Sequence, residues 1–207
     1  MEFFDRAGRH RLGPLFELTA YTGLRRGEIT GLHWADVDLV DRQIVVRHNR
    51  VSVDGRIQET TTKTRSGRRT VPLNDAAVAA LLTYLAAPPG RGTRSSPGSL
   101  GDARPCVHDG GRQSVGSGLR HQVFQKIRKQ GEPLPELTFH GLRHCAGSLW
   151  LAAGVDISIV SKLLGHSSIA ITADIYAHML KGVGQRAVDG AAELIAHTVH
   201  SQQAVSG

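Results

Sequence analysis

Two segments of this 207-residue chain carry side chains whose types and spacing could attack a phosphodiester bond. In the first, TFHGLRHC, His140 and Arg143 lie three residues apart, so on a helix both side chains emerge on one face. In the second, LLGHSSIAITADIYAH, Tyr176 lies ten residues beyond His166. Arginine can bind phosphate oxygens bidentately, histidine can move protons or donate hydrogen bonds, and tyrosine can act as a nucleophile. Together these residue types indicate a site where tyrosine attacks a phosphodiester.

The same segments resemble the catalytic signature of the tyrosine recombinase (phage integrase) family, which runs His-x-x-Arg-His, Leu-Gly-His and Tyr. Upstream, TGLRRGEI at residues 22–29 resembles the family's first arginine box, and TKTRSGRRTVPL at residues 62–73 resembles its lysine hairpin. All four blocks occur in the family's order. The resemblance implies an α+β fold, mostly helical, with a small antiparallel sheet that carries the lysine hairpin.

The resemblance also implies a reaction that needs no metal and no cofactor. Tyr176 attacks the scissile phosphate, which leaves a 3′-phosphotyrosyl bond and a free 5′ hydroxyl. A second 5′ hydroxyl can then reverse the step and join the DNA to a new partner. The implied catalytic residues are Arg25 and Arg143 as binders of phosphate charge, His140 as proton acceptor, His166 as donor to the phosphate, Lys63 as general acid for the leaving oxygen, and Tyr176 as nucleophile.

The net charge suits a polyanionic partner. Lys and Arg number 25 against 18 Asp and Glu, which gives a formal charge of +7 and a pI near 10.0. Several basic residues are candidate contacts to a DNA backbone, although solvated surface side chains are the alternative for each. These candidates are Arg26, Arg65, Arg68, Arg69, Arg120 and Lys126.

Apolar periodicity and turn residues predict the elements that position these groups. Helices are expected over residues 12–21, 75–87, 119–130, 140–153, 156–164 and 185–200, with a short helix after Arg25. Four period-two segments at 43–47, 50–53, 56–60 and 69–73 predict one small antiparallel sheet. Asp54-Gly55 and Ser66-Gly67 are its expected hairpin turns, with Lys63 beside the second.

Length and composition favour one catalytic domain over residues 1–207. The Pro- and Gly-rich stretch at about 88–118 is interpreted as a flexible insertion, and 185–200 as a C-terminal helix. The first arginine box begins at residue 22, so the family's N-terminal DNA-gripping (core-binding) domain is expected to be absent. No apolar run suggests a membrane span, and the two cysteines are interpreted as reduced thiols, so a cytoplasmic location is expected.

The resemblance implies double-stranded DNA attachment sites as substrate, a homotetramer on DNA, and possible accessory directionality or DNA-bending proteins. Three alternatives remain open. His140 and His144, four residues apart on a helix, could bind zinc with a third histidine. The chain could be a non-catalytic DNA-binding module of the same fold. It could also be similar to a type IB topoisomerase, which relaxes supercoils without specific sites.

Overall fold

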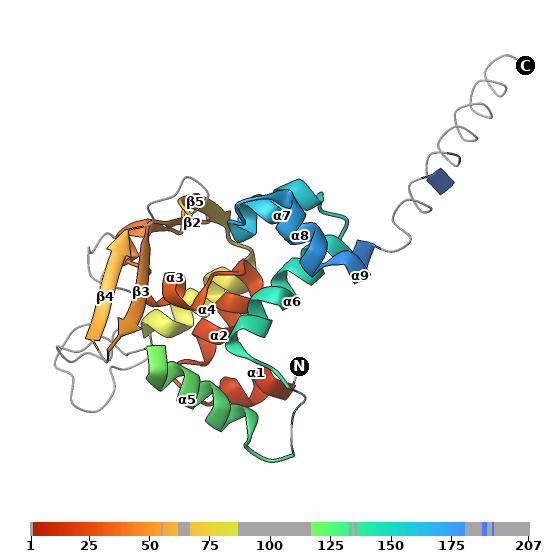
Figure 1. Ribbon diagram of the computed structural model, residues 1–207. Coiled ribbons are helices and arrows are strands. Elements are labelled where there is room, and N and C mark those ends of the chain that lie inside the picture. The colour runs from red at the N-terminus through yellow and green to blue at the C-terminus, as the bar shows by residue number, and fades with distance from the viewer. Residues whose placement is uncertain are drawn as a thin grey trace, which may run out of the picture.

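The structure, a computed structural model, describes residues 2–54, 56–61, 67–86, 117–132, 134, 136–180, 188–189 and 192. The helices are α1 (Glu2–Ala7), α2 (Gly13–Thr22), α3 (Arg26–Thr30), η1 (Trp34–Asp36), α4 (Asp75–Ala86), α5 (Ser117–Arg128), α6 (Phe139–Ala152), α7 (Ile157–Leu164), α8 (Ile169–Ile175) and α9 (Ala177–Leu180). The strands are β1 (Val37–Asp38), β2 (Gln43–Val46), β3 (His48–Val53), β4 (Arg56–Thr61) and β5 (Arg69–Pro72) (Figure 1). Within these ranges, no helix has the length and apolar character that crossing a bilayer requires.

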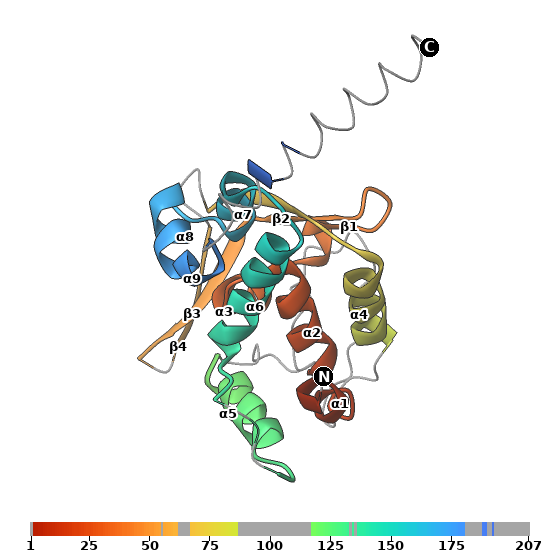
Figure 2. The same cartoon turned by 90° about the vertical axis from the view of Figure 1, so that its right-hand side faces the viewer.

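Helix α2 is the central element of the helical part. It lies between α4 on one side and α6 on the other (Figure 2). Pro14 stands in its first turn, where the missing N–H costs nothing, and the helix ends at Gly23, whose φ of 62° is left-handed. Leu15, Phe16 and Leu18 are almost fully buried. This rigid helix therefore sets the position of the arginine-bearing turn that follows it.

All five phenylalanines of the chain pack together where α1, α2, α5 and the start of α6 meet. Phe124 of α5 contacts Phe16 of α2 edge to face, with ring centroids 5.3 Å apart, and Phe139 of α6 lies 5.8 Å from Phe16. The helix that follows the 88–118 segment thus shares the core of α2. This packing holds the N-terminus of α6, the helix with His140 and Arg143.

The strands form two antiparallel sheets in the order β1-β2-β5 and β3-β4. The prediction of one sheet was therefore wrong. Strand β5 pairs with β2, with Val71 opposite Ile44, and both side chains are fully buried. Strands β3 and β4 make a separate ribbon with Val53 opposite Arg56, which matches the predicted turn at 54–55.

The expected hairpin between residues 56–60 and 69–73 is not the pairing observed, because β4 pairs with β3 and β5 with β2. Burial explains the difference. The apolar face of residues 69–73 covers the main core beside β2, whereas β4 presents mainly polar, exposed side chains. Lys63 and the rest of 62–66 lie outside the described residues, as do 88–116 and most of 185–200.

The C-terminal helices α7, α8 and α9 pack on the end of α6 (Figure 1). Their small core consists of Val160, Leu164 and Tyr176, with Trp150 of α6 packed against it. Helix α7 begins at an Asp156 cap, whose carboxylate accepts from the Ser158 amide at 2.8 Å, and ends at Gly165. Tyr176 lies at the junction of α8 and α9.

Candidate active site

The C-terminus of α7 gathers three arginines from distant parts of the chain. The backbone carbonyls of Leu163, Leu164 and Gly165 accept hydrogen bonds from Arg69 Nε at 2.6 Å, Arg143 Nη2 at 2.5 Å and Arg25 Nη2 at 2.6 Å, respectively. The last carbonyls of a helix have no partner within it and carry the negative end of its dipole. Gly165 adopts φ 67°, which turns the chain and exposes its carbonyl. This helix end therefore serves as the template on which the cationic site is assembled.

Arg143 is the most deeply placed of these cations. Its side chain is buried, and Nη1 also donates to Gly23 O at 2.6 Å. Burial, together with the neighbouring Arg25 and Arg69, lowers the pKa of Arg143 to about 10. It remains charged at neutral pH. Among the described residues its hydrogen bonds use two of the five N–H donors of a guanidinium, which leaves donors for an anion.

Glu28 binds two of the arginines and fixes their orientation. Its buried carboxylate accepts from Arg25 Nη1 at 2.9 Å and from both terminal nitrogens of Arg69 at 2.9 Å. It also accepts from the Arg25 amide at 2.7 Å. Burial alone would raise the pKa of Glu28, but the bidentate bond from Arg69 and its charge lower it, as does Arg25. Glu28 therefore binds two arginine side chains and one backbone amide.

The buried position of Arg69 corrects its interpretation as a DNA-backbone contact. Its side chain is only 7% exposed, and its donors are directed to Glu28 and Leu163. Three other candidate contacts, Arg26, Arg68 and Lys126, are exposed. Arg65 and the side chain of Arg120 lie outside the described residues, so no position is assigned to them.

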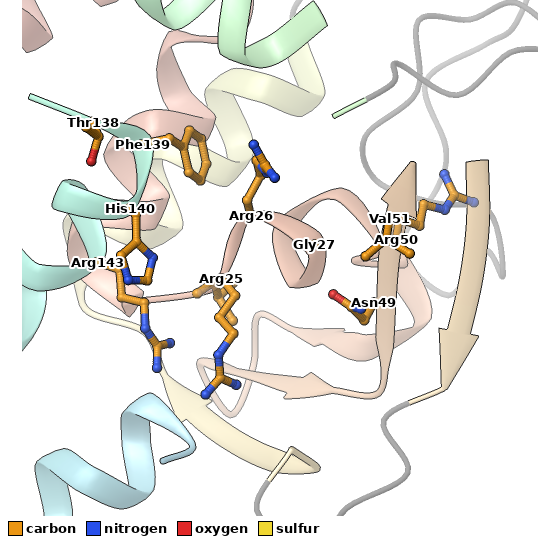
Figure 3. Close-up of a pocket in the computed structure, with 11 residues that line it drawn as sticks. Arg25, Arg26, Gly27, Asn49, Arg50, Val51, Thr138, Phe139, His140 and Arg143 are labelled. Carbon is orange, nitrogen blue, oxygen red and sulfur yellow. The ribbon is translucent and has the colours of Figure 1, made fainter. Parts of the chain in front are cut away.

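Arg25 and Arg143 point the same way. Figure 3 shows both side chains extending together toward the end of α7, with the His140 ring beside Arg143. Arg25 lies just before α3 and Arg143 lies in α6, yet their side chains donate hydrogen bonds to adjacent backbone carbonyls at the end of α7. Two guanidinium groups held this closely repel each other, which is unfavourable unless an anion lies between them. Arg25 and Arg143 are therefore placed to bind an anion that carries two negative charges or gains negative charge during a reaction.

A cavity of about 710 Å³ opens beside these arginines. Its walls come from the turn before α3, the first turn of α6 and strand β3 (Figure 3). Arg25, Arg26, His140 and Arg143 line one part, and Asn49, Arg50 and Val51 line the part formed by β3. The three β3 residues were not predicted from the sequence, because only the close approach of β3 to α3 places them there. The opening is wide and basic, as a polyanion requires.

Two histidines of α6 connect this cavity with Tyr176. The rings of His140 and His144 lie 4.5 Å apart edge to face, and the His144 ring lies 6.0 Å from that of Tyr176. Burial and the charge of Arg143 lower the pKa of His144, and burial, His144 and Arg143 do the same for His140. Both imidazoles are therefore neutral near pH 7 and able to accept a proton.

The pKa of His166 is strongly lowered. Its Nδ1 lies 2.8 Å from Thr172 Oγ1, which fixes the ring orientation. Burial, together with Arg143 and Arg25, lowers the pKa of His166 to about 4. It is a neutral ring beside two cations, so its remaining N–H can donate to an anion without adding charge.

Tyr176 is buried and its hydroxyl group faces α6. The Oη atom lies 3.4 Å from His144 Nδ1, and a Cβ atom at Gly147 would stand 2.2 Å from it. Gly147 is thus required by the close approach of the phenol. Burial raises the pKa of Tyr176, while Arg143 opposes this shift. In this state the phenol is protonated and its hydroxyl group is directed at His144.

Because the histidines of the site are neutral when the protein is folded, we expect the free energy of unfolding to fall at acidic pH. An unfolded His166 binds a proton below pH 6.5, whereas the folded one stays neutral until about pH 4. The unfolded state therefore binds more protons in this window, and stability falls as pH falls. We expect the melting temperature to drop from pH 7 to pH 4.5, and His166→Asn to flatten the drop. Thermal unfolding across pH tests this, with the exposed His178→Asn as control; equal slopes in wild type and His166→Asn would contradict it.

Because Arg69 is buried, we expect its substitution to lower the stability of the fold strongly and to affect DNA binding only slightly by loss of direct contacts. Arg69→Met leaves the Glu28 carboxylate with half of its partners, and breaking a buried pair costs about 3–5 kcal/mol. The corresponding fall in melting temperature is roughly 6–20 °C for a chain of this size. Exposed Arg68→Met is the matched control and should leave the melting temperature unchanged. If Arg69→Met kept its stability and only weakened DNA binding, the original interpretation would be correct.

No third zinc ligand lies close to His140 and His144 among the described residues. One group of three ligand-bearing side chains converges in the described part of the chain, and it consists of His33, Asp36 and His48. This group is distinct from the candidate active site.

Comparison with known proteins places these features in a family. The model of the phage integrase family matches residues 1–182. A tyrosine recombinase XerC from Roseiflexus sp. is 35% identical over 175 residues, and a XerC-like tyrosine recombinase from Caldanaerobacter subterraneus subsp. tengcongensis is 29% identical over 192 residues. The matches cover 83% and 87% of this chain but 48% and 49% of the relatives, so the chain spans about half their length.

Solved structures show the same fold. The Tn1549 transposon integrase, in complex with circular intermediate DNA, superposes with a TM-score of 0.72 over 89% of this chain and 63% of that chain, at 22% identity. The XerA recombinase gives a TM-score of 0.65 over 89% of this chain and 60% of that chain, at 25% identity. The mostly helical arrangement with small antiparallel sheets is therefore a known architecture.

Proposed function

The chain belongs to the phage integrase family, the tyrosine recombinases, and from this we propose that it is the catalytic domain of a site-specific DNA recombinase. The observation that supports the proposal most directly is the pairing of Arg25 and Arg143 on adjacent carbonyls of α7, beside a basic cavity. The substrate is double-stranded DNA carrying attachment sites. No metal or nucleotide takes part in the proposed reaction.

In the first step Tyr176 Oη forms a bond to the scissile phosphorus while the bond to the 5′ oxygen breaks. The phenol proton passes to His140, and a proton from Lys63 goes to the departing 5′ oxygen. The product is a 3′-phosphotyrosyl ester and a free 5′ hydroxyl. Attack by a 5′ hydroxyl from another strand reverses the step, so the ester energy is conserved and no external energy source is needed.

The electrostatics of the site support this assignment of roles. Negative charge grows on the phosphate oxygens in the transition state, and fixed cations bind that state more tightly than the ground state. Arg25 and Arg143 are fixed by backbone carbonyls and by Glu28, so little reorganisation is needed when the charge develops. His166, held by Thr172, donates a hydrogen bond to the same phosphate.

The buried phenol adds a step before cleavage. Tyr176 leaves its contact with His144 and Gly147, and α8 and α9 shift so that Oη reaches the phosphate. His144 lies between Tyr176 and His140, which makes it a suitable carrier of the phenol proton toward His140. DNA binding at the cavity supplies the anion that favours this movement.

The assembly follows the family pattern in our proposal, with four copies on paired attachment sites and accessory directionality or DNA-bending proteins. The exposed basic residues Arg26, Arg68 and Lys126 contact the DNA backbone, and Arg65 and Arg120 extend this surface. From the sequence alone, we propose that residues 88–118 are an insertion in the same catalytic domain.

A suicide substrate tests the proposal. A duplex with the attachment sequence of the host element, nicked near the scissile phosphate so that the 5′ fragment is lost, should trap the protein covalently on the DNA 3′ end. The adduct should resist EDTA, and peptide mapping should place it on Tyr176. Absence of an adduct on every attachment sequence tried would favour the DNA-binding module, and relaxation of plasmid lacking such sequences would favour the topoisomerase.

A further inference from the structure

A second cluster of side chains joins η1 to the β3-β4 ribbon, and it shares no residue with the group of three arginines at the end of α7. His33 precedes η1, Asp36 ends it, and His48 begins β3. One potential ligand atom from each of the three lies within 4.8 Å of the other two. Glu59 on β4 faces the same cluster.

The separations approach those of a metal site. His33 Nε2 lies 3.0 Å from Glu59 Oε1, which is 3.4 Å from His48 Nδ1, and His48 Nε2 lies 3.5 Å from Asp36 Oδ2. In a tetrahedral zinc site with bonds near 2.0–2.2 Å, ligand atoms are about 3.3 Å apart. One ion can bind only one ring nitrogen of His48, so the relevant set is one ligand atom each from His33, Asp36 and His48, which lie within 4.8 Å of one another and must move closer to reach this spacing.

Asp36 supplies an independent reason to expect a ligand. Its side chain is only 3% exposed, and Oδ1 accepts from Arg47 Nη1 at 2.7 Å. Oδ2 is buried, faces His48, and receives no hydrogen bond from the residues that the structure describes. A buried carboxylate oxygen without a donor is costly, and a bound cation removes that cost.

The carboxylates of the cluster have fixed orientations. Asp36 and Glu59 each form an ion pair with an arginine on the side away from the histidines. Arg47 binds the outer oxygen of Asp36 and Arg50 that of Glu59. Such outer partners orient ligands in known metal sites.

We propose that His33, Asp36 and His48 bind a divalent transition-metal ion of the zinc type, with Glu59 as fourth ligand. Imidazole nitrogens and carboxylate oxygens are the donors that this class of ion accepts. The His33 and His48 rings are stacked, with centroids 4.1 Å apart and planes within 7°, so lone pairs in the two ring planes cannot meet at one point. Binding tilts one ring out of the stack to make the lone pairs converge.

The site would link η1 to both strands of the ribbon. Strand β4 ends at Thr61, directly before the segment that contains Lys63. An ion at the cluster would therefore fix the strand from which this segment leaves. This consequence depends on the proposed function, whereas binding of the ion does not.

Zinc titration of the EDTA-treated full chain tests the site. We expect one equivalent to bind, and the melting temperature to rise by roughly 5–10 °C at a hundredfold excess over Kd. Co²⁺ in its place should give the strong visible absorption of a tetrahedral ion with nitrogen and oxygen ligands. EDTA should reverse each effect.

Two variants identify the ligands. The double variant His33→Gln/His48→Gln should no longer bind one equivalent of zinc, and it should lose the thermal shift and the Co²⁺ absorption. The control His178→Gln, an exposed histidine outside the cluster, should keep all three. Zinc binding that is unchanged in the double variant, or absent in the wild type, would overturn the proposal. The suicide-substrate adduct is measured separately, so failure of the metal site leaves the proposed function untouched.

Discussion

Tyr176→Phe is expected to abolish the covalent protein–DNA adduct while leaving the fold intact. In the proposed reaction the phenol oxygen forms the new bond to phosphorus, and no other atom of the ring can replace it. Among the described residues, the polar contact of its hydroxyl group is with His144 Nδ1, and it is long at 3.4 Å. Losing it should cost at most about 1 kcal/mol, and thus a shift of no more than roughly 4 °C in melting temperature.

The exposed Tyr21→Phe provides the matched control. It removes a phenol from the same protein without touching the site, and its adduct yield should equal that of the wild type. Denaturing gel electrophoresis of protein crosslinked to labelled suicide substrate measures both variants. An adduct that persists in Tyr176→Phe would place the nucleophile on another residue.

Arg143→Met should reduce the cleavage rate by at least about 10³-fold, because it removes a preorganised donor and cation from the transition state. Removal of a single such donor commonly costs 10²–10³. The loss at Arg143 should be larger than that of a single donor, because Arg143 also lies beside Arg25, which binds the next carbonyl of α7. Single-turnover adduct formation gives the rate directly.

The same substitution should change stability little. The folded protein holds the Arg143 charge under strain, because burial and two neighbouring arginines lower its pKa to about 10. Methionine removes this repulsion and fills the space, which offsets the loss of hydrogen bonds to Gly23 and Leu164. A melting temperature far below that of wild type, together with near-normal cleavage, would show that Arg143 is structural and not catalytic.

The contrast between Arg143 and Arg69 shows how two buried arginines divide the work of the site. Arg69 is neutralised by a bidentate carboxylate, so it stabilises the fold and positions Glu28. Arg143 is bound only to carbonyls among the described residues, so its charge is left for a ligand. A protein gains stability from the first arrangement and reactivity from the second.

Much of the local structure could be predicted from the residues alone. Asn74 and Asp156 accept hydrogen bonds from the first turns of α4 and α7, and Gly23 and Gly165 end α2 and α7 in the left-handed conformation. These signals depend only on neighbouring residues, so they survive without knowledge of the fold. The helix that carries His140 and Arg143 on one face was predicted for the same reason.

The sheet arrangement could not be predicted in this way. Strand β5 pairs with β2, more than twenty residues earlier, instead of with its neighbour β4. Local alternation identifies a strand but not its partner, and the choice depends on which apolar face the core can cover. The same dependence hid the β3 residues Asn49 and Arg50, which line the cavity.

The sequence by itself determined the chemistry that this protein can attempt, because the types and order of Arg25, His140, Arg143, His166 and Tyr176 are written in it. Only the tertiary structure decided how these groups meet. The bonds that join them span up to 140 residues, and they form because the end of α7 offers three carbonyls that no residue within the helix can satisfy. Tertiary packing also decided that Tyr176 rests against Gly147 and His144, since a short-range pattern carries no information about which surface a phenol covers.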